Sequence, residues 1–572
     1  MVSARRWLRA GFRTSRRAAA DPLRAAALLG IDGHTARLQS RALQRLRLVA
    51  PLGPVLKPAL TAASLLAACN EPTRAVLRDA GADVASVRDA GPGDPRVGAA
   101  QPGDCAAAHG GCSAYATCEP AGSGLRRCVC APGLRVRDDQ RGCEGLLLAS
   151  VDRDGRAGAG PTLDPQLAAD GRFVTFVSSV PRLATDVLPP ALDAPATPQC
   201  YVRDLRTGRT AVVSADSEGG YASGGACVSP QLVADGSRVA FLYADAALTL
   251  RAPRGRGLQV YSRALGASAQ AGALTWHATD VNRPGVNGGA IGGLRINRSG
   301  SRFVVATDGR LATNDDDTQT DLYLLEVTTG AVRRLTQRAD GSVAPWVPCA
   351  GGNVGGWWWF SRDGNLATFN SARNFVGADL DAVRDPYLVR VDPPLVLLLA
   401  SPRRQLADGD CHVLELGTVV SGDGRWALFQ SDNPRFDASL QYNEPDYYLR
   451  DLSAASGAAS VRALHLRPGL ADQPALSGDG SVAMITGLTR VDPDGDGQRG
   501  VTPHLYRVTL TSDPVAIELV DRTADGRVLD TERGRFVPSL SDDARAVAFV
   551  TSARLLPEDE NDTSDVYVRV WW

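Results

Sequence analysis

The feature that most constrains the fold is a short unit that recurs seven times between Gly145 and the C-terminus. Each copy has a turn, an apolar strand, a longer connection and a second strand, with a period of about sixty residues. The turn-and-strand elements cover 169–179, 234–243, 299–307, 361–371, 421–431, 477–487 and 541–552. Because one small unit cannot bury its apolar face alone, such repeats stack against their neighbours. The sequence therefore predicts an array of like sheets.

The residues within each copy favour antiparallel strands. Asp-Gly pairs such as Asp170-Gly171 supply the positive φ that a tight hairpin requires. The alternation of Val547 and Phe549 with smaller residues places apolar side chains between stacked sheets. We predict an all-β fold over 146–572, a β-propeller of seven four-stranded blades, with six blades as the alternative.

The ends of the repeat region predict how the ring closes. The last copy stops after its second conserved strand, near Val570, and lacks a fourth strand. The segment Leu146–Val151, ahead of the first copy, has the composition of that missing strand. We therefore expect it to complete the last sheet, which leaves no free sheet edge at the closure.

The repeat also resembles a known family. Its pattern, P-x-x-S-x-D-G followed by V-A-F and D-x-Y-V-R-D-L-x-T-G, resembles the TolB-like, or WD40-like, bacterial propeller repeat. The resemblance extends over nearly the whole repeat region and implies a propeller whose partners are proteins.

A cysteine-rich segment, 104–145, precedes the repeats. Its six cysteines suit a small module that disulfides stabilise in an oxidising compartment, and spacing alone leaves fifteen connectivities open. The Cys128-x-Cys130 pair followed by Ala131-Pro132-Gly133 resembles the EGF-like domain. This resemblance implies the pairs Cys105–Cys118, Cys112–Cys128 and Cys130–Cys143. The calcium-binding pattern of that family is missing, so a spacer or contact module is expected.

The N-terminal region is interpreted as an export signal. Residues 55–69 combine one lysine, an apolar run and small residues before Cys69, and Leu66-Ala67-Ala68-Cys69 resembles a bacterial lipobox, in which the cysteine is lipidated. An ordinary signal peptide is the alternative. Residues 1–54 are interpreted as an unstructured or wrongly assigned extension, with translation starting near Val49 or Val55. Residues 70–103 are predicted to form a disordered tether.

Four further cysteines lie in the repeats. We predict that Cys200 pairs with Cys227 within one blade and that Cys349 pairs with Cys411 across neighbouring blades. Free buried thiols are the alternative.

The longer connections share one face of the predicted ring, so function is expected there. Asp492, Asp494 and Asp496 have the alternation of a calcium loop, although carboxylates that cap turns and keep loops soluble are the favoured explanation. The aromatic and histidine residues in or beside these connections are a candidate ligand face, with simple core packing as the alternative. They are Trp276, His277, Trp346, Trp357 and His412.

The sequence contains no nucleophile elbow, zinc-protease, phosphate-loop or dinucleotide motif, and its net charge of -1 does not favour nucleic acid. We therefore expect a non-enzymatic, lipid-anchored scaffold of the cell envelope or surface that binds a protein or a glycan, without a cofactor. A secreted hydrolase that uses loop carboxylates, or a structural protein stabilised by calcium, is the alternative. Membrane contact is expected through the N-terminal lipid only.

Overall fold

A computed structural model provides the structure of the chain, and every described residue lies within the compact unit Ala85–Trp572. Among the described residues, no helix is long and apolar enough to cross a membrane. The structure describes residues 94–106, 108–152, 154–158, 160–180, 183–184, 197–217, 225–244, 248, 258–266, 269–277, 291–315, 319–342, 344, 358–371, 373–377, 385–398, 417–431, 446–454, 461–466, 474–487, 504–529 and 537–571.

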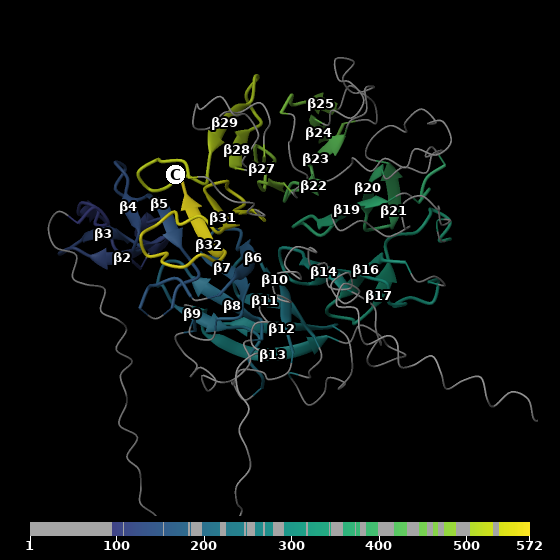
Figure 1. Cartoon of the computed structure of the whole chain (residues 1–572), viewed down its shortest axis with the longest axis horizontal. Helices are drawn as coiled ribbons and strands as arrows, with labels where there is room; N and C mark the ends of the chain where they lie inside the picture. The colour runs from purple at the N-terminus through teal and green to yellow at the C-terminus, as the bar shows by residue number, and fades with distance from the viewer. Residues whose placement is uncertain are drawn as a thin grey trace, which may run out of the picture. The chain divides into compact units, whose positions relative to one another are not determined.

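The fold is all-β, and its antiparallel sheets follow one another along the chain, as the colours of Figure 1 show. The first three sheets of the repeats are β6 (Thr162–Leu167), β7 (Phe173–Ser178), β8 (Gln199–Asp204) and β9 (Thr210–Val212); β10 (Cys227–Leu232), β11 (Arg238–Ala244), β12 (Leu258–Leu265) and β13 (Ala271–His277); and β14 (Ile291–Ile296), β15 (Arg302–Thr307), β16 (Asp321–Glu326) and β17 (Val332–Arg334).

Three further four-stranded sheets come next, and then a sheet of five strands. They are β18 (Trp358–Phe360), β19 (Leu366–Ser371), β20 (Asp385–Arg390) and β21 (Leu395–Leu398); β22 (Val419–Val420), β23 (Trp426–Ser431), β24 (Asp446–Asp451) and β25 (Val461–Ala463); β26 (Ala475–Leu476), β27 (Val482–Thr486), β28 (Leu505–Thr509) and β29 (Ala516–Leu519); and β30 (Ser539–Leu540), β31 (Ala546–Thr551), β32 (Asp565–Val570), β5 (Cys143–Leu148) and β4 (Leu134–Val136).

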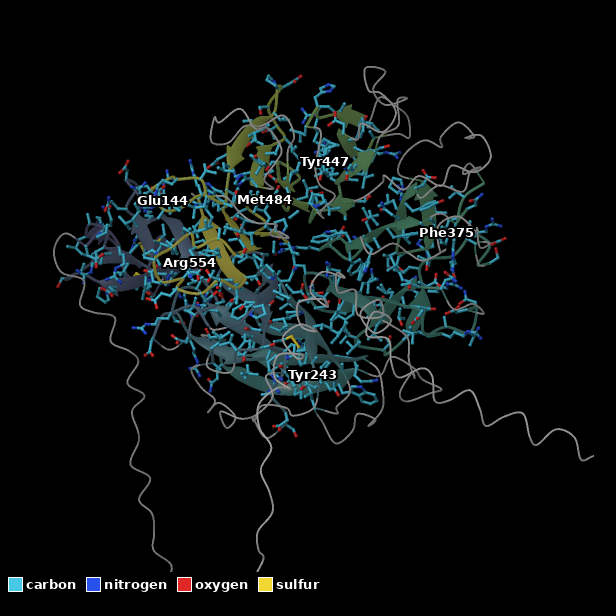
Figure 2. All side chains as sticks on the ribbon, in the orientation of Figure 1. Glu144, Tyr243, Phe375, Tyr447, Met484 and Arg554 are labelled. Atoms are coloured by element: carbon cyan, nitrogen blue, oxygen red, sulfur yellow. A yellow bond between two sulfur atoms is a disulfide. The ribbon has the colours of Figure 1, made fainter. Side chains whose placement is uncertain are left out.

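The core lies between neighbouring sheets rather than at one centre. Seven clusters of buried apolar side chains are present in the described part of the chain, and each joins two successive sheets, the last sheet being joined to the first. Tyr243, Tyr447 and Met484, labelled in Figure 2, are fully buried in or beside these clusters. The alternating apolar residues predicted from sequence therefore face adjacent sheets.

The hairpin turns that join the first and second strands form a closed circle of hydrogen bonds. The backbone amide of one turn donates to a carbonyl of the next, as from Ala169 to Ala234 and from Ala234 to Arg298. The circle continues through the turns at 361–364, 421–424 and 477–480, and the amide of Asp542 donates to the carbonyl of Ala169 at 2.9 Å. These bonds close the array because the seventh turn meets the first.

A second closure joins the two ends of the repeat region. Strand β5 pairs with β32 in antiparallel register, with Leu148 opposite Tyr567 and Leu146 opposite Arg569. This pairing confirms that the segment ahead of the first repeat completes the last sheet. We call the junction of β5 and β32 the latch. Ser150 adds a side-chain link, because its hydroxyl donates to the buried carboxylate of Asp565 at 2.6 Å.

A repeated aromatic pair anchors the connections between the second and third strands. A phenylalanine of the second strand stacks on a tyrosine of the third, as in Phe369 on Tyr387 with ring centres 5.2 Å apart. The hydroxyl of that tyrosine donates to the carbonyl of Arg373 at 2.7 Å, and Tyr567 donates to Asp559 at 2.6 Å. The tyrosine of the Asp-x-Tyr sequence that recurs in the third strands is therefore explained by ring stacking and hydrogen bonding within the fold.

The cysteine-rich segment is continuous with the last sheet. Strands β1 (Gln101–Pro102), β2 (Ala116–Pro120) and β3 (Leu125–Cys130) form its own sheet beside a 3-10 turn, η1 (Ala108–Gly111), whereas β4 and β5 belong to the five-stranded sheet. Disulfides join Cys105 to Cys118, Cys112 to Cys128 and Cys130 to Cys143, which are the pairs that the EGF-like resemblance implies.

Two boundaries differ from the expectation. The predicted tether, 70–103, ends too late, because Gln101–Pro102 pairs with β3 and Val97 forms a bridge with Val129. The predicted boundary at residue 145 falls inside β5. Composition missed the first because Gln101–Pro102 is short and polar, and the second because β5 begins at the last cysteine of the preceding segment.

The disulfide between Cys200 and Cys227 joins two sheets. Cys200 lies on β8, the third strand of its sheet, and Cys227 begins β10 of the next sheet. The predicted pair is therefore present, but it joins neighbouring sheets and does not lie within one blade. Cys69, Cys349 and Cys411 lie outside the described residues.

The seventh turn provides a test of turn chemistry. Ala544 has φ 58°, at the position where six other turns place glycine, for example Gly424 with φ 72°. A side chain in this region costs about 1 kcal/mol relative to glycine. We expect Ala544→Gly to raise the free energy of unfolding by up to about 1 kcal/mol, measured by urea denaturation. Gly424→Ala should lower it, and a destabilised Ala544→Gly variant would contradict this account.

The latch should depend on pH through Asp565. Burial raises the pKa of this carboxyl from 3.8 to about 6, so the folded state holds a proton that the unfolded chain has released. The stabilising contribution is therefore complete below the unfolded pKa and is lost as pH rises toward 6. Asp565→Asn should remove this loss. When the pH rises from 4.5 to 7, the free energy of unfolding of the variant should therefore gain about 2 kcal/mol relative to that of wild type. Denaturation of both proteins at both pH values measures this gain. An equal change in the free energy of unfolding with pH in the two proteins would refute the prediction.

Candidate functional site

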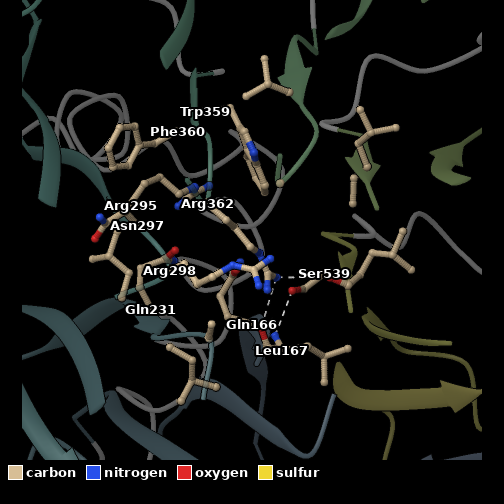
Figure 3. Close-up of a pocket in the computed structure, with 18 residues that line it drawn as sticks. Gln166, Leu167, Gln231, Arg295, Asn297, Arg298, Trp359, Phe360, Arg362 and Ser539 are labelled. Carbon is tan, nitrogen blue, oxygen red and sulfur yellow. Dashed lines mark hydrogen bonds between the residues drawn. The ribbon is translucent and has the colours of Figure 1, made fainter. Parts of the chain in front are cut away.

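The first strands of the seven sheets surround a small cavity. Strands β6, β10, β14, β18, β22, β26 and β30 contact one another in a closed succession, so each contributes to its lining. The cavity measures about 40 Å³ and 18 residues line it, as Figure 3 shows. All the charged residues of this lining are arginines: Arg295, Arg298 and Arg362. The wall is therefore cationic and suits an anionic group.

Alignment of the repeats on the turn explains which side chains line the cavity. The residue two places before each turn belongs to the lining in six of the seven sheets, and in four successive sheets it is large and polar or aromatic. These four residues are Gln166, Gln231, Arg295 and Trp359. Ala475 and Ser539 hold the same position in later sheets, so the wall is bulky on one side and small on the other.

We call the space enclosed by the first strands, which contains the cavity, the channel. Two of the arginines lie across the end of the channel that is formed by the hairpin turns. The second residue of each hairpin turn lies at this end. It is Arg298 in the third sheet, Arg362 in the fourth and Asp542 in the seventh. Arg298 and Arg362 both pair with the carboxylate of Asp542, the latter at 2.9 Å. Arg362 also donates to the carbonyls of Leu167 and Leu540, and Figure 3 shows it among the lining residues. These bonds restrict this end of the channel.

Arg295 is held by aromatic stacking. Its guanidinium carbon lies 5.5 Å from the ring centre of Trp358 and 5.2 Å from that of Trp359. Within the described residues its Nη1 donates to the carbonyl of Leu294 at 3.0 Å, whereas Nε has no hydrogen-bond partner. Burial lowers its pKa to about 10, and Asp164 opposes this change, so Arg295 stays charged at neutral pH.

The backbone next to Arg295 is strained. Asp164 on β6 and Ser229 on β10 have φ 52° and 51°, and a bulge interrupts the pairing of each strand there. The corresponding residue of β14 is Gly293, with φ 141°. Strained non-glycine residues and bulges cluster at functional sites. Burial also raises the pKa of Asp164, which favours its neutral form.

Two larger grooves lie outside the channel. One of 700 Å³ lies between the cysteine-rich segment and the last sheets, and its Arg96–Asp94 and Arg135–Glu144 pairs are 2.5 and 2.6 Å long. Another of 530 Å³ contains Trp276 and His277. Neither groove shares a residue with the channel cavity.

Trp276 and His277, predicted for a ligand face, lie on β13, the outermost strand of its sheet. The indole of Trp276 donates to Gln259 at 3.2 Å, and Nε2 of His277 lies 2.8 Å from the hydroxyl oxygen of Ser262. Burial lowers the pKa of His277 to about 4, and Arg238 adds to this effect. A residue this poorly basic is a weak general base at neutral pH. Trp346, Trp357 and His412 lie outside the described residues.

The acidic connections that the structure describes are engaged within the protein. Asp315 accepts the hydroxyl of Tyr323, and Arg334 pairs with Asp321 at 2.5 Å. The described part of the chain contains no group of three acidic, histidine or cysteine side chains placed to hold a metal ion. The calcium candidates Asp492, Asp494 and Asp496 lie outside that part.

Sequence reasoning missed Arg295. The turn-centred alignment contains the signal, because Arg295 precedes its turn by the same two residues as Gln166 and Gln231.

No model of a known protein family matches the sequence, and no curated protein matches it. Solved structures similar to this chain include TolB from Acinetobacter baumannii, at 13% identity and TM-score 0.32, over 64% of this chain and 65% of that one, just under two thirds. They include an oligogalacturonate lyase from Vibrio parahaemolyticus, at 14% and 0.43, over 76% and 96%. They also include the Myceliophteria thermophila Cps50 (Swd1) β-propeller domain, at 12% and 0.36, over 72% and 96%.

The chain is thus an all-β protein of repeated sheets with propeller-like neighbours, and likenesses this distant carry no argument about its activity. The expectation that it is not an enzyme is nevertheless corrected. That expectation rested only on the lack of familiar catalytic motifs, and the structures similar to this chain include the oligogalacturonate lyase and a prolyl endopeptidase.

The channel end should depend on Asp542. Asp542→Asn leaves two neighbouring guanidiniums without their shared carboxylate, so we expect the free energy of unfolding to fall by about 1–3 kcal/mol. Urea denaturation at pH 7 measures the change. Asp525→Asn is the control, because Asp525 is exposed and pairs with Arg527 far from the cavity lining. A change no larger than that of the control would show that the shared carboxylate does not stabilise the fold.

Proposed function

We propose that the protein is an exported, lipid-anchored binding protein of the cell envelope or surface that holds part of a protein partner in its central channel. The observation that carries this proposal is the convergence of Gln166, Gln231, Arg295 and Trp359 from four successive sheets on one cavity. Binding sites on propellers lie in such shared space because a single sheet has no concave surface of its own.

The approach of the partner follows from strand direction. In an antiparallel sheet the first and third connections lie at one end and the second lies at the other. The hydrogen-bonded turns and the Arg298–Asp542–Arg362 group restrict the first end. The partner therefore enters from the end that carries the longer connections, where loops have room to contact it.

The architecture proposed for this role is a seven-bladed β-propeller preceded by an EGF-like module. Seven successive sheets, seven interfacial apolar clusters and the closed circle of turns support the blade number. The disulfides of 105–143 and the Cys128-x-Cys130 pair support the module.

We propose that the protein is located outside the cytoplasm. Four disulfides in the described residues indicate an oxidising compartment. Lipidation at Cys69 would attach the chain to a membrane, and mass spectrometry of the mature N-terminus detects the acyl chains on that residue.

Photo-crosslinking tests the binding proposal. A photoreactive amino acid replaces Gln231 in the full chain, and the protein is irradiated in envelope extract. We expect a discrete crosslinked species, identified by mass spectrometry, that disappears when Arg295→Gln is added. The same amino acid at Arg425, which pairs with Asp451 away from the cavity lining, is the control.

Crosslinks of equal yield at both positions, or none at Gln231, would reject a channel ligand. Hydrolysis screens with peptides and glycans on the same preparation separate a binding protein from an enzyme.

A further inference from the structure

We propose that the channel binds the free C-terminal carboxylate of a protein chain and that Arg295 is the group that pairs with it. This inference rests on the proposed function and specifies the chemistry of its ligand. It follows from four properties of the site: unused hydrogen-bond donors, charge, size and the occupied faces of the aromatic rings.

The guanidinium of Arg295 has donors to spare. Arginine has five N–H donors in a rigid fork that matches a carboxylate bidentately. In the described residues one hydrogen bond, from Nη1 to Leu294, is made, and Nε has no partner. A buried donor without a partner is costly, so a ligand that supplies two acceptor oxygens relieves this cost.

The charge of the channel favours an anion. Asp542 pairs with Arg298 and Arg362, so one cation of that group remains uncompensated. Asp164 is the carboxyl that acts on Arg295, so the three arginines face two carboxylates, which leaves an excess of one positive charge. A carboxylate that enters the channel therefore meets a net positive wall.

The size of the cavity suits the terminal carboxylate of a chain. A space of about 40 Å³ holds roughly three water molecules. A carboxylate group is of this size. The amide side chains of Gln166 and Gln231 line the same cavity and are able to bond the last peptide groups of an inserted chain.

The aromatic rings favour a peptide over a glycan. Trp358 is 4% exposed, and Trp359 is partly buried against the apolar clusters on the two sides of the neighbouring β22–β25 sheet. Arg295 stacks on both rings. The third aromatic residue of this strand, Phe360, is 2% exposed. A flat platform for a sugar is therefore lacking among the described lining residues.

The test uses the full chain and a pool of random N-acetylated hexapeptides, prepared as free acids and as C-terminal amides. Equilibrium dialysis with mass spectrometry measures retention of each form. We expect wild type to retain the free acids about 10- to 100-fold more strongly, as for a hydrogen bond between charged groups. Arg295→Gln should abolish this preference, and Arg295→Lys should restore part of it.

The matched control is Arg425→Gln, because Arg425 also lies over a tryptophan, Trp426, at 4.9 Å, but outside the cavity lining. It should keep the wild-type preference. Thermal denaturation of each variant shows whether the fold is retained. Loss of the preference in the control as well would overturn the assignment to Arg295.

Three other outcomes would overturn the inference. Equal retention of acids and amides rejects a carboxylate, and retention of amides that contain Asp or Glu assigns a side-chain carboxylate instead. Arg295-dependent retention of a uronic acid oligosaccharide, without peptides, assigns a glycan and leaves the channel as the binding site. If crosslinking from Gln231 fails too, the proposed function fails with the inference.

Discussion

The structure depends on closure of the array of sheets. Since the buried apolar clusters lie between sheets, each sheet exposes apolar side chains to water if one neighbour moves away. The circle of hydrogen bonds between the hairpin turns and the pairing of β5 with β32 prevent this opening. Ser150 and Asp565 reinforce the same junction from the side chains. Closure also removes the exposed edge that a linear array would leave at the last sheet.

Closure also creates the candidate site. Arg298, Arg362 and Asp542 are far apart in sequence and belong to three sheets, yet the circle of turns brings them across one opening. One layer away, Arg295 and its tryptophans face glutamines from two other sheets. A site of this kind exists only in the closed ring, because each sheet contributes one or two side chains.

The channel is where local preferences are violated. Asp164 and Ser229 adopt positive φ values that cost a non-glycine residue about 1–3 kcal/mol. Arg295 is charged in surroundings that lower its pKa, and its Nε has no partner in the described residues. Positive φ values at non-glycine residues also occur elsewhere, as at Ala544 in the seventh hairpin turn. What distinguishes the channel is that two of them occupy equivalent places on neighbouring strands beside a charged guanidinium, and such violations of local preference are typical of a binding site.

The sequence by itself determined the repeat, the hairpin turns and the strand that completes the last sheet, because turn chemistry and alternation are local properties. The disulfides of the cysteine-rich segment follow the EGF-like resemblance. Tertiary structure decided that Cys200 and Cys227 join two sheets, that Trp276 lies on an outer strand and that Arg295 faces the channel. These facts depend on which sheets are neighbours and how strands are ordered across each sheet. Alternation marks which side chains share a face of a strand, but only the assembled ring decides whether that face meets the channel, the next sheet or the outer groove.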